Sequence, residues 1–347
     1  MREIKNFFRK VRKGKYKRFM KKTLASIIGG RILSEETAAI SLREILADKI
    51  SLPQISAFLS CLQMRGLSLS ELRGFHRVLS ESGVKLDLQE PNLIDVCGTG
   101  GDGKRTFNIS TLAAFVLAGA GAKVAKHGNF SATSGAGSSD VLQFLGIEFT
   151  DDIEKLRRNL RDANICYLHA PLFQPALKTV APVRKEIGFR TFFNLLGPLL
   201  NPAQPRFQFI GVAEPAVLRL YRYFLEDGKV DFALVHARDG YDEISLTGAF
   251  DIVTNEGVET FYPEDLAFQT IEPEELFGGE SVADAAKQFL QILRGEAARA
   301  QNEVVIANAT FALHLTQPKL DFAECKSRSE ESLNSGAAFR SFQKIVS

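Results

Sequence analysis

The residues with the clearest chemical potential form a glycine-rich segment between an apolar run and a helical pattern. Asp95-Val-Cys-Gly-Thr-Gly-Gly-Asp-Gly103 holds four glycines in six residues. Glycine lets the backbone approach a ligand closely and adopt positive φ angles. Asn108-Ile-Ser-Thr111 follows and places hydrogen-bonding groups at the expected start of a helix, where free N–H groups and the helix dipole favour phosphate. The segment therefore predicts a phosphate-binding loop.

A P-loop of the nucleotide-hydrolase type is the obvious alternative for these glycines. Gly98 to Lys104 satisfies the first part of that motif, but the next residue is Arg105 instead of Ser or Thr. The hydroxyl that holds Mg²⁺ in a P-loop is therefore missing. The sequence argues against a P-loop and in favour of another phosphate site.

A second polar segment follows the next expected strand. Lys126-His-Gly-Asn129 supplies a cation and an amide, and several hydroxyl side chains come after it, at Ser131, Thr133, Ser134 and Ser138. Successive strands of a parallel sheet present their carboxyl ends at one edge, so both segments are expected to lie there. Together they predict a site for a sugar phosphate.

The elements that must position these segments follow from the hydrophobic pattern. Short apolar runs at 93–97, 122–125, 165–168, 207–212 and 232–235 alternate with glycine-rich turns and helical segments, which predicts an α/β domain with a largely parallel sheet. Close, short strands between Ile244 and Tyr262 indicate a local antiparallel excursion. Residues 23–90 and the tail from Val282 to Val346 are helical in pattern.

The charge is unevenly distributed along the chain. Residues 1–22 carry eleven basic side chains and one acid, so the remaining chain holds 32 basic and 40 acidic residues. This basic leader places Ile4, Phe7, Phe8 and Val11 on one helical face. It fits a helix on an anionic membrane or polyanion, and fits better a solvated first helix docked on the domain behind it. The mildly acidic remainder offers no general surface for nucleic acid.

Composition excludes several classes of protein. The sequence is 45% hydrophobic and 24% charged, and no stretch approaches the ~20 apolar residues of a membrane span. Its four cysteines are scattered and lack metal-ligand spacing. We therefore expect neither a disulfide framework nor a structural zinc site, and we expect a cytoplasmic protein.

Several segments together resemble the anthranilate phosphoribosyltransferases of tryptophan biosynthesis. The resemblance rests, in chain order, on the glycine loop, Thr106-Phe-Asn-Ile-Ser-Thr111, Lys126-His-Gly-Asn129, Ala181-Pro-Val-Arg184, Arg190-Thr191, Asn194-Leu-Leu-Gly-Pro-Leu-Leu-Asn-Pro202 and Asp239-Gly-Tyr-Asp-Glu-Ile-Ser-Leu-Thr-Gly248.

The resemblance implies a nucleoside phosphorylase-like (class III phosphoribosyltransferase) fold. After the leader, residues 23–90 would form a small helical domain that mediates homodimerisation and on which mid-chain helices dock, and residues 91–347 a large α/β domain. The implied reaction joins anthranilate to 5-phosphoribosyl 1-diphosphate (PRPP), with no nucleic acid partner and no integral membrane association.

The family motifs also imply site residues, and no dedicated catalytic acid or base. Anthranilate would contact Gly98, Asn129 and Arg184, and Mg²⁺, with two ions per monomer, would bind Ser110, Asp242 and Glu243. The donor PRPP would contact residues of both glycine-rich segments, namely Gly98, Gly101, Asp102, Thr106, Asn108, Ile109, Ser110, Thr111, Lys126, His127, Gly128, Asn129, Phe130, Ser131, Ala132, Thr133, Ser134 and Ser138.

The chemistry of the residues supports these roles. Loss of diphosphate from ribose C1 requires neutralisation of its charge, and Mg²⁺ held by one or two carboxylates suits that task. Asp242 and Glu243 supply such a pair if the backbone bends there, since neighbours on a regular strand face opposite ways. A solvated acidic turn is the alternative. Arg184 offers a planar donor for a carboxylate, or else a surface ion pair.

The sequence departs from the family pattern at two positions and leaves two alternative functions open. Gln174 stands where many relatives have histidine on the expected path of anthranilate, and Phe130 stands where a basic residue is common. A nucleoside phosphorylase of the same fold is one alternative, although its phosphate loop differs. A non-catalytic relative that binds nucleic acid is the other, and it predicts loss of Arg184 or of the acidic pair.

Overall fold

The computed structural model describes residues 18–131 and 135–346. Their contacts divide the chain into two compact units. Unit 1 extends to Val84 and includes Gln174–Leu200, and unit 2 contains Lys85–Phe173 and the chain from Asn201 onward. The predicted division at residue 90 and the predicted dimerisation stay predictions. The predicted amphipathic face from Ile4 to Val11 lies outside the described residues.

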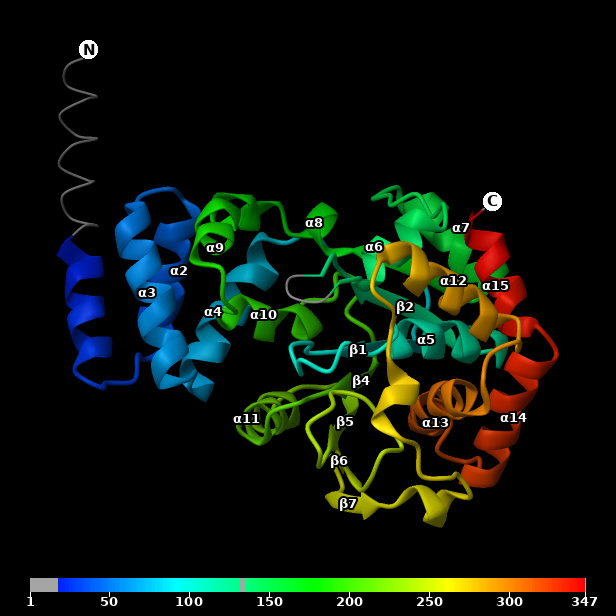
Figure 1. Ribbon diagram of the computed structural model, residues 1–347. Coiled ribbons are helices and arrows are strands. Elements are labelled where there is room, and N and C mark those ends of the chain that lie inside the picture. Colours follow the sequence, from blue (N-terminus) through cyan, green and yellow to red (C-terminus); the bar gives the residue numbers. More distant parts are fainter. Residues whose placement is uncertain (1–17, 132–134, 347) are drawn as a thin grey trace. The chain divides into compact units, whose positions relative to one another are not determined.

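Unit 1 is helical throughout its described part, as the sequence pattern predicts (Figure 1). A first helix covers residues 18–28. It is followed by α2 (Glu35–Leu46), α3 (Leu52–Arg65), α4 (Leu69–Ser82), η1 (Pro175–Thr179), α9 (Ala181–Ile187), α10 (Phe192–Leu196) and η2 (Gly197–Leu199). Ser34 caps α2 and Ser68 forms a capping box with Glu71 on α4.

An aromatic cluster joins the two chain segments of unit 1. The rings of Phe75 and Phe192 stack with centroids 4.2 Å apart, and Phe58 meets both edge-on. All three are buried. Aromatic pairs add about 1 kcal/mol each beyond the burial of their surface. This packing explains why residues 174–200 group with the N-terminal helices.

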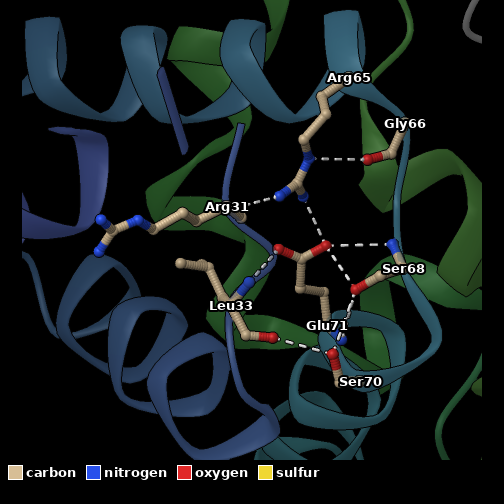
Figure 2. A network of polar contacts seen from close by, with 7 residues as sticks. All are labelled: Arg31, Leu33, Arg65, Gly66, Ser68, Ser70 and Glu71. Atoms are coloured by element: carbon tan, nitrogen blue, oxygen red, sulfur yellow. Dashed lines mark hydrogen bonds and ion pairs between the residues drawn. The ribbon is translucent and has the colours of Figure 1, made fainter. Parts of the chain in front are cut away.

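A buried carboxylate, Glu71, organises the start of α4 (Figure 2). It is 0% exposed and accepts hydrogen bonds from the backbone N–H groups of Leu33 (2.9 Å) and Ser68 (3.0 Å) and from the Ser68 hydroxyl (2.7 Å). Arg65 pairs with it and donates to the carbonyl of Arg31 (2.6 Å). Both carboxylate oxygens of Glu71 therefore meet donors, and a guanidinium lies beside them, which makes this buried charge tolerable.

The described residues of unit 2 form a seven-stranded sheet in the order β3-β2-β1-β4-β5-β6-β7. Strands β1 to β5 are parallel, and β6 and β7 are antiparallel. The predicted parallel sheet and its antiparallel excursion are confirmed. The strands are β1 (Leu93–Gly98), β2 (Lys123–Gly128), β3 (Ile165–His169), β4 (Phe207–Gly211), β5 (Asp231–Ala237), β6 (Phe250–Thr254) and β7 (Val258–Phe261).

Helices surround this sheet (Figure 1). The apolar helix α5 (Ile109–Gly119) is buried along nearly its whole length, between β1 and β2 and the helices of the C-terminal segment. The C-terminal segment is helical as predicted. The remaining elements are α6 (Ser138–Phe144), α7 (Ile153–Ala163), α8 (Ala170–Phe173), α11 (Pro215–Glu226), η3 (Pro263–Leu266), η4 (Pro273–Leu276), α12 (Val282–Leu293), α13 (Arg299–Thr316), α14 (Phe322–Asn334) and α15 (Ala337–Val346).

The two faces of the sheet carry separate apolar clusters. Ile94 and Val96 of β1 pack in the larger cluster with α5, whereas Leu93 packs in a smaller cluster with Ala125 and Leu168. This alternation follows from the period of two along a strand. None of the helices in the described ranges combines the length and the hydrophobicity that a membrane span requires.

Candidate active site

The glycine loop leaves the carboxyl end of β1 and enters α5. Gly100, Gly101 and Gly103 adopt φ angles of 65°, 77° and 73°, a region that other residues rarely occupy. Gly98 is required for space instead, because a Cβ there would strike the carboxylate of Asp242. A Cβ on its ladder partner Gly211 would likewise strike the backbone carbonyl of Asp242. The glycines therefore serve both the turn and the approach of an acidic segment.

That acidic segment connects β5 to β6 without regular strand structure. Asp242 and Glu243 are 6% and 8% exposed, and the Asp242 Oδ2 atom accepts the N–H of Gly100 at 2.6 Å. The side-chain amide of Asn308 in α13 binds the backbone of Ile244, the residue after Glu243. Its oxygen accepts the N–H of Ile244 (3.1 Å) and its nitrogen donates to the Ile244 carbonyl (2.9 Å). The alternative of a solvated acidic turn is therefore wrong. The backbone at Asp242 is irregular, as the expected bend requires.

Burial and mutual repulsion shift the ionisation of both acids. Burial raises the pKa of Asp242 to about 7, and the charge of Asp102 adds to the shift. Burial and the charge of Asp242 raise the pKa of Glu243 well above its usual value, against the opposing effects of Lys126 and of a hydrogen bond from Ser110. These shifts mark a site short of positive charge.

The oxygen ligands in this site suit Mg²⁺. Carboxylates and a hydroxyl are hard donors, and a cation would offset the burial and the nearby negative charge that raise the pKa values of both acids. No group of three or more His, Cys, Asp or Glu side chains in the described ranges has the arrangement of a metal cluster. Mg²⁺ does not need one, because it commonly uses one or two carboxylates together with substrate phosphates.

The second polar segment lies against the first. The Asn108 amide donates to the carbonyl of Ala136 at 3.2 Å, which ties the start of α5 to the connection between β2 and α6. Asp140 accepts the N–H groups of Ser131 and Gly137, both at 2.9 Å, and the Ser138 hydroxyl donates to the Asn129 carbonyl at 3.2 Å. The predicted ligands Ala132, Thr133 and Ser134 lie outside the described residues.

Two residues of this segment that were predicted to contact PRPP have buried side chains. Lys126 is 2% exposed and donates to the Val96 carbonyl at 2.6 Å, and His127 is 6% exposed. Phe130 is exposed, and its ring meets that of His169 edge-on at 4.8 Å. His169 Nδ1 also shares a hydrogen bond with the Ser139 hydroxyl at 2.9 Å.

Other residues predicted to contact PRPP lie in or next to the glycine loop. Asp102 accepts the N–H of Lys104 at 3.1 Å, and Thr106 forms an isolated bridge with Phe277. The described members of the donor set, the three predicted Mg²⁺ ligands and two of the predicted anthranilate contacts, Gly98 and Asn129, all belong to unit 2.

The third predicted anthranilate contact, Arg184, belongs to unit 1. Its guanidinium lies 5.3 Å from the ring centroid of Phe193 and 3.5 Å from the Asn194 side-chain oxygen, and burial lowers its pKa. No acid pairs with it among the described residues, which argues against a simple surface ion pair. Gln174 lies in the same unit and is 6% exposed.

Sequence reasoning missed the buried support of the site. Asp95 accepts hydrogen bonds from the His127 N–H and the Asn201 amide, yet neither Asp95 nor Asn201 was among the predicted site residues. The signal was present, because Asp95 places a charge in the middle of an apolar run expected to be a buried strand.

The chain resembles known proteins over nearly its full length. The model for the α/β domain of the glycosyl transferase family matches residues 90–339, and the model for its helical bundle domain matches residues 21–83. The anthranilate phosphoribosyltransferase of Cytophaga hutchinsonii is 46% identical over 94% of this chain and the whole of that protein. That of Flavobacterium johnsoniae is 44% identical over 94% of this chain and 98% of its own.

Solved structures agree with these relatives. The anthranilate phosphoribosyltransferase of Thermus thermophilus superposes with a TM-score of 0.85 at 34% identity, covering 93% of this chain and 98% of that one. The Saccharomyces cerevisiae enzyme in complex with PRPP and Mg superposes with a TM-score of 0.86 at 25% identity, covering 94% and 96%. The chain therefore belongs to the anthranilate phosphoribosyltransferase family.

Proposed function

We propose that this chain transfers the phosphoribosyl group of PRPP to the amine of anthranilate in tryptophan biosynthesis. The bond from ribose C1 to the diphosphate oxygen breaks, the bond from C1 to nitrogen forms, and the amine loses one proton. The products are N-(5-phosphoribosyl)anthranilate and diphosphate. Membership of the family supports this activity. The single observation that carries it is the buried Asp242 carboxylate against the glycine loop, 2.6 Å from the Gly100 nitrogen.

The donor is proposed to bind along the carboxyl ends of β1 and β2. The glycine loop and the first turn of α5 suit the phosphates, because glycine lets the backbone approach a ligand closely and a helix N-terminus presents N–H groups and the positive end of its dipole. Ser110, Thr111 and Ser138 add hydroxyl donors. The hydrogen bond from Asn108 to Ala136 supports this placement, since it holds the two segments side by side.

Mg²⁺ is proposed to be held by Ser110, Asp242 and Glu243, with two ions per monomer. When bound, it would neutralise the diphosphate that leaves. The hard oxygen donors and the raised pKa values of both acids support this assignment. The number of ions follows from the family resemblance.

Anthranilate is proposed to contact Gly98, Asn129 and Arg184. The Arg184 guanidinium presents paired N–H donors that fit a carboxylate. Because the anthranilate amine is neutral and already nucleophilic, the reaction needs positioning and charge stabilisation more than a strong base. No residue is therefore proposed as a dedicated general acid or base.

We further propose a homodimer that associates through the helices of unit 1 and acts in the cytoplasm. Exposed apolar side chains support the interface, with Ile28, Ile32 and Met64 between 63% and 89% exposed.

The two rival functions find no favouring observation. A non-catalytic relative would have lost Arg184 or the acidic pair, but Asp242 and Glu243 are present and buried against the glycine loop. The full-length identity to anthranilate phosphoribosyltransferases likewise speaks against a nucleoside phosphorylase.

The experiment follows the loss of anthranilate fluorescence with purified protein, PRPP and Mg²⁺. Turnover that requires Mg²⁺ and collapses in Asp242→Ala and Arg184→Ala would support the reaction and both roles. Glu256→Ala, in the exposed turn after β6, and Lys185→Ala, the exposed neighbour of Arg184, are matched controls and should keep full activity. A folded wild-type protein without turnover at saturating donor would overturn the proposal.

A further inference from the structure

The pairing of β1 with β2 ends well before the two loops that are proposed to hold the donor. β1 pairs with β4 continuously from Ile94 to Gly98, and β2 pairs with β3 from Val124 to Gly128. Between β1 and β2, however, the register covers only Leu93 with Lys123 and Ile94 with Val124. Both strands continue to the ligand loops, but residues 95–98 of β1 and 125–128 of β2 have no ladder pairing with each other.

Side chains satisfy the backbone groups that this ladder leaves open. The N–H of Val124 donates toward β3, to the Asn164 carbonyl at 2.8 Å, so the alternation of the strand turns the polar groups of Ala125 and His127 toward β1. The His127 N–H donates to Asp95 Oδ1 at 3.0 Å, and the Ala125 carbonyl accepts from the Asn201 amide at 2.8 Å.

Asp95 and Asn201 also hold each other. The Asn201 amide donates to Asp95 Oδ2 at 2.8 Å, and its oxygen accepts the N–H of Ala203 at 2.9 Å. Asp95 is 1% exposed and Asn201 is 6% exposed. Asp95 uses one oxygen for His127 of β2 and the other for Asn201, so both oxygens are engaged and the carboxylate acts as a two-sided clamp.

We propose that Asp95, held by Asn201, is a positioning residue for the donor site. It fixes the carboxyl end of β2, and with it the turn from Lys126 to Asn129, relative to the glycine loop that follows β1. The inference rests on the proposed donor site. Asp95 itself contacts the backbone of His127, so it acts through that turn and not on the substrate.

A carboxylate is the appropriate group at this place. It accepts on both sides, whereas an amide accepts on one side and donates on the other. In Asp95→Asn the side-chain NH₂ must face either the His127 N–H or the Asn201 amide, and one of these buried donors loses its acceptor. The variant keeps the volume of the side chain, so it tests the clamp without opening a cavity.

The decisive measurement compares the two substrates in steady state. In Asp95→Asn we expect the apparent KM for PRPP to rise at least tenfold, while the KM for anthranilate stays within twofold of wild type. Asn201→Ala, which keeps the bond from His127 to Asp95, should raise the KM for PRPP by a smaller factor of about three to five. Asp251→Asn is the matched control in β6 of the same sheet, and should leave both constants unchanged.

Amide hydrogen exchange reports the clamp without any turnover. Peptides that cover residues 123–131 should exchange faster in folded Asp95→Asn, while peptides from β4 and β5 keep wild-type protection. This readout separates the inference from the proposed function, since wild-type protein that lacks activity would refute the function and leave the exchange comparison intact. If Asp95→Asn does not fold, Asn201→Ala carries both measurements.

A purely structural role predicts a different pattern. Folded Asp95→Asn with a PRPP KM within twofold of wild type, or with equal increases for both substrates, would overturn the proposal. Unchanged exchange in residues 123–131 would overturn it as well.

Discussion

Buried acids in the two units are supported in opposite ways. Glu71 of unit 1 meets two backbone N–H groups, a hydroxyl and the guanidinium of Arg65. Asp242 and Glu243 of unit 2 face each other's charge and that of Asp102. In unit 1 both oxygens of the carboxylate accept hydrogen bonds and a guanidinium balances its charge. In unit 2 the charged groups nearest to the two carboxylates are mostly acids. A buried acid with all its partners holds a fold together, whereas a buried acid without them marks a place for a ligand.

The largest effect is expected from neutralising Asp242, one of the two buried acids that lie near other negative charges. Asp242→Asn should reduce kcat/KM by about 1,000-fold, because loss of a Mg²⁺ ligand removes several kcal/mol of charge stabilisation. Its thermal stability without Mg²⁺ should stay equal to that of wild type or rise, since a repelled charge disappears. Calorimetry and initial rates together check this; a clear loss of stability would break the comparison.

The opposite behaviour is expected in unit 1. Glu71→Gln leaves Arg65 without a counter-charge and weakens the acceptor of the Ser68 N–H. The variant should therefore lose about 3 kcal/mol of unfolding free energy. Urea unfolding measures the loss. The KM values of the folded fraction should match wild type, and a selective change in KM for PRPP would contradict the purely structural role of Glu71.

The pH dependence of Mg²⁺ binding sharpens the contrast further. The pKa of Asp242 is raised to about 7, so below pH 7 the cation must displace a proton. The Mg²⁺ concentration for half-maximal activity should rise about tenfold for each pH unit below 7. In the absence of Mg²⁺, folded Asp242 keeps its proton up to about pH 7, whereas the same side chain in the unfolded protein loses it at lower pH. The free energy of unfolding should therefore fall as pH rises toward 7. Titrations at pH 6 and pH 8 are sufficient.

The smallest effect is expected at His76 of α4. Its Nε2 lies 2.9 Å from the Leu199 carbonyl, and burial lowers its pKa. The unfolded chain takes up the proton first as pH falls below about 6.5, so wild type should lose stability there. His76→Gln should flatten that slope in acid unfolding. An unchanged slope would show that the acid sensitivity arises elsewhere.

Local patterns predicted the parts of the fold that depend on neighbours in sequence. The apolar runs before the glycine turns became β1 and β2, and the helical pattern of residues 23–90 became α2, α3 and α4. The glycine loop, the Asn108 turn and the acidic pair were recognisable because their chemistry and spacing are unusual.

The rest depends on contacts between distant segments. Asn201 reaches Asp95 across 106 positions, and Phe192 stacks on Phe75, and neither pairing leaves a trace in spacing. Lys126 sits in a polar motif, yet its long side chain turns inward to a carbonyl of β1. Only the folded sheet determines which side of β2 faces the interior at that point.

The grip of Asn308 on the backbone of Ile244 has a consequence for how the enzyme is made. The acidic pair reaches the glycine loop across 142 positions of sequence, and its connection is held from α13, still further along the chain. Contacts of such long separation are slow to form, and a growing chain cannot make them before the later segment has left the ribosome. The strands of the sheet precede α13 in the chain, whereas the proposed cation site must wait for Asn308, so competence to bind Mg²⁺ would report that the chain has folded at least as far as α13.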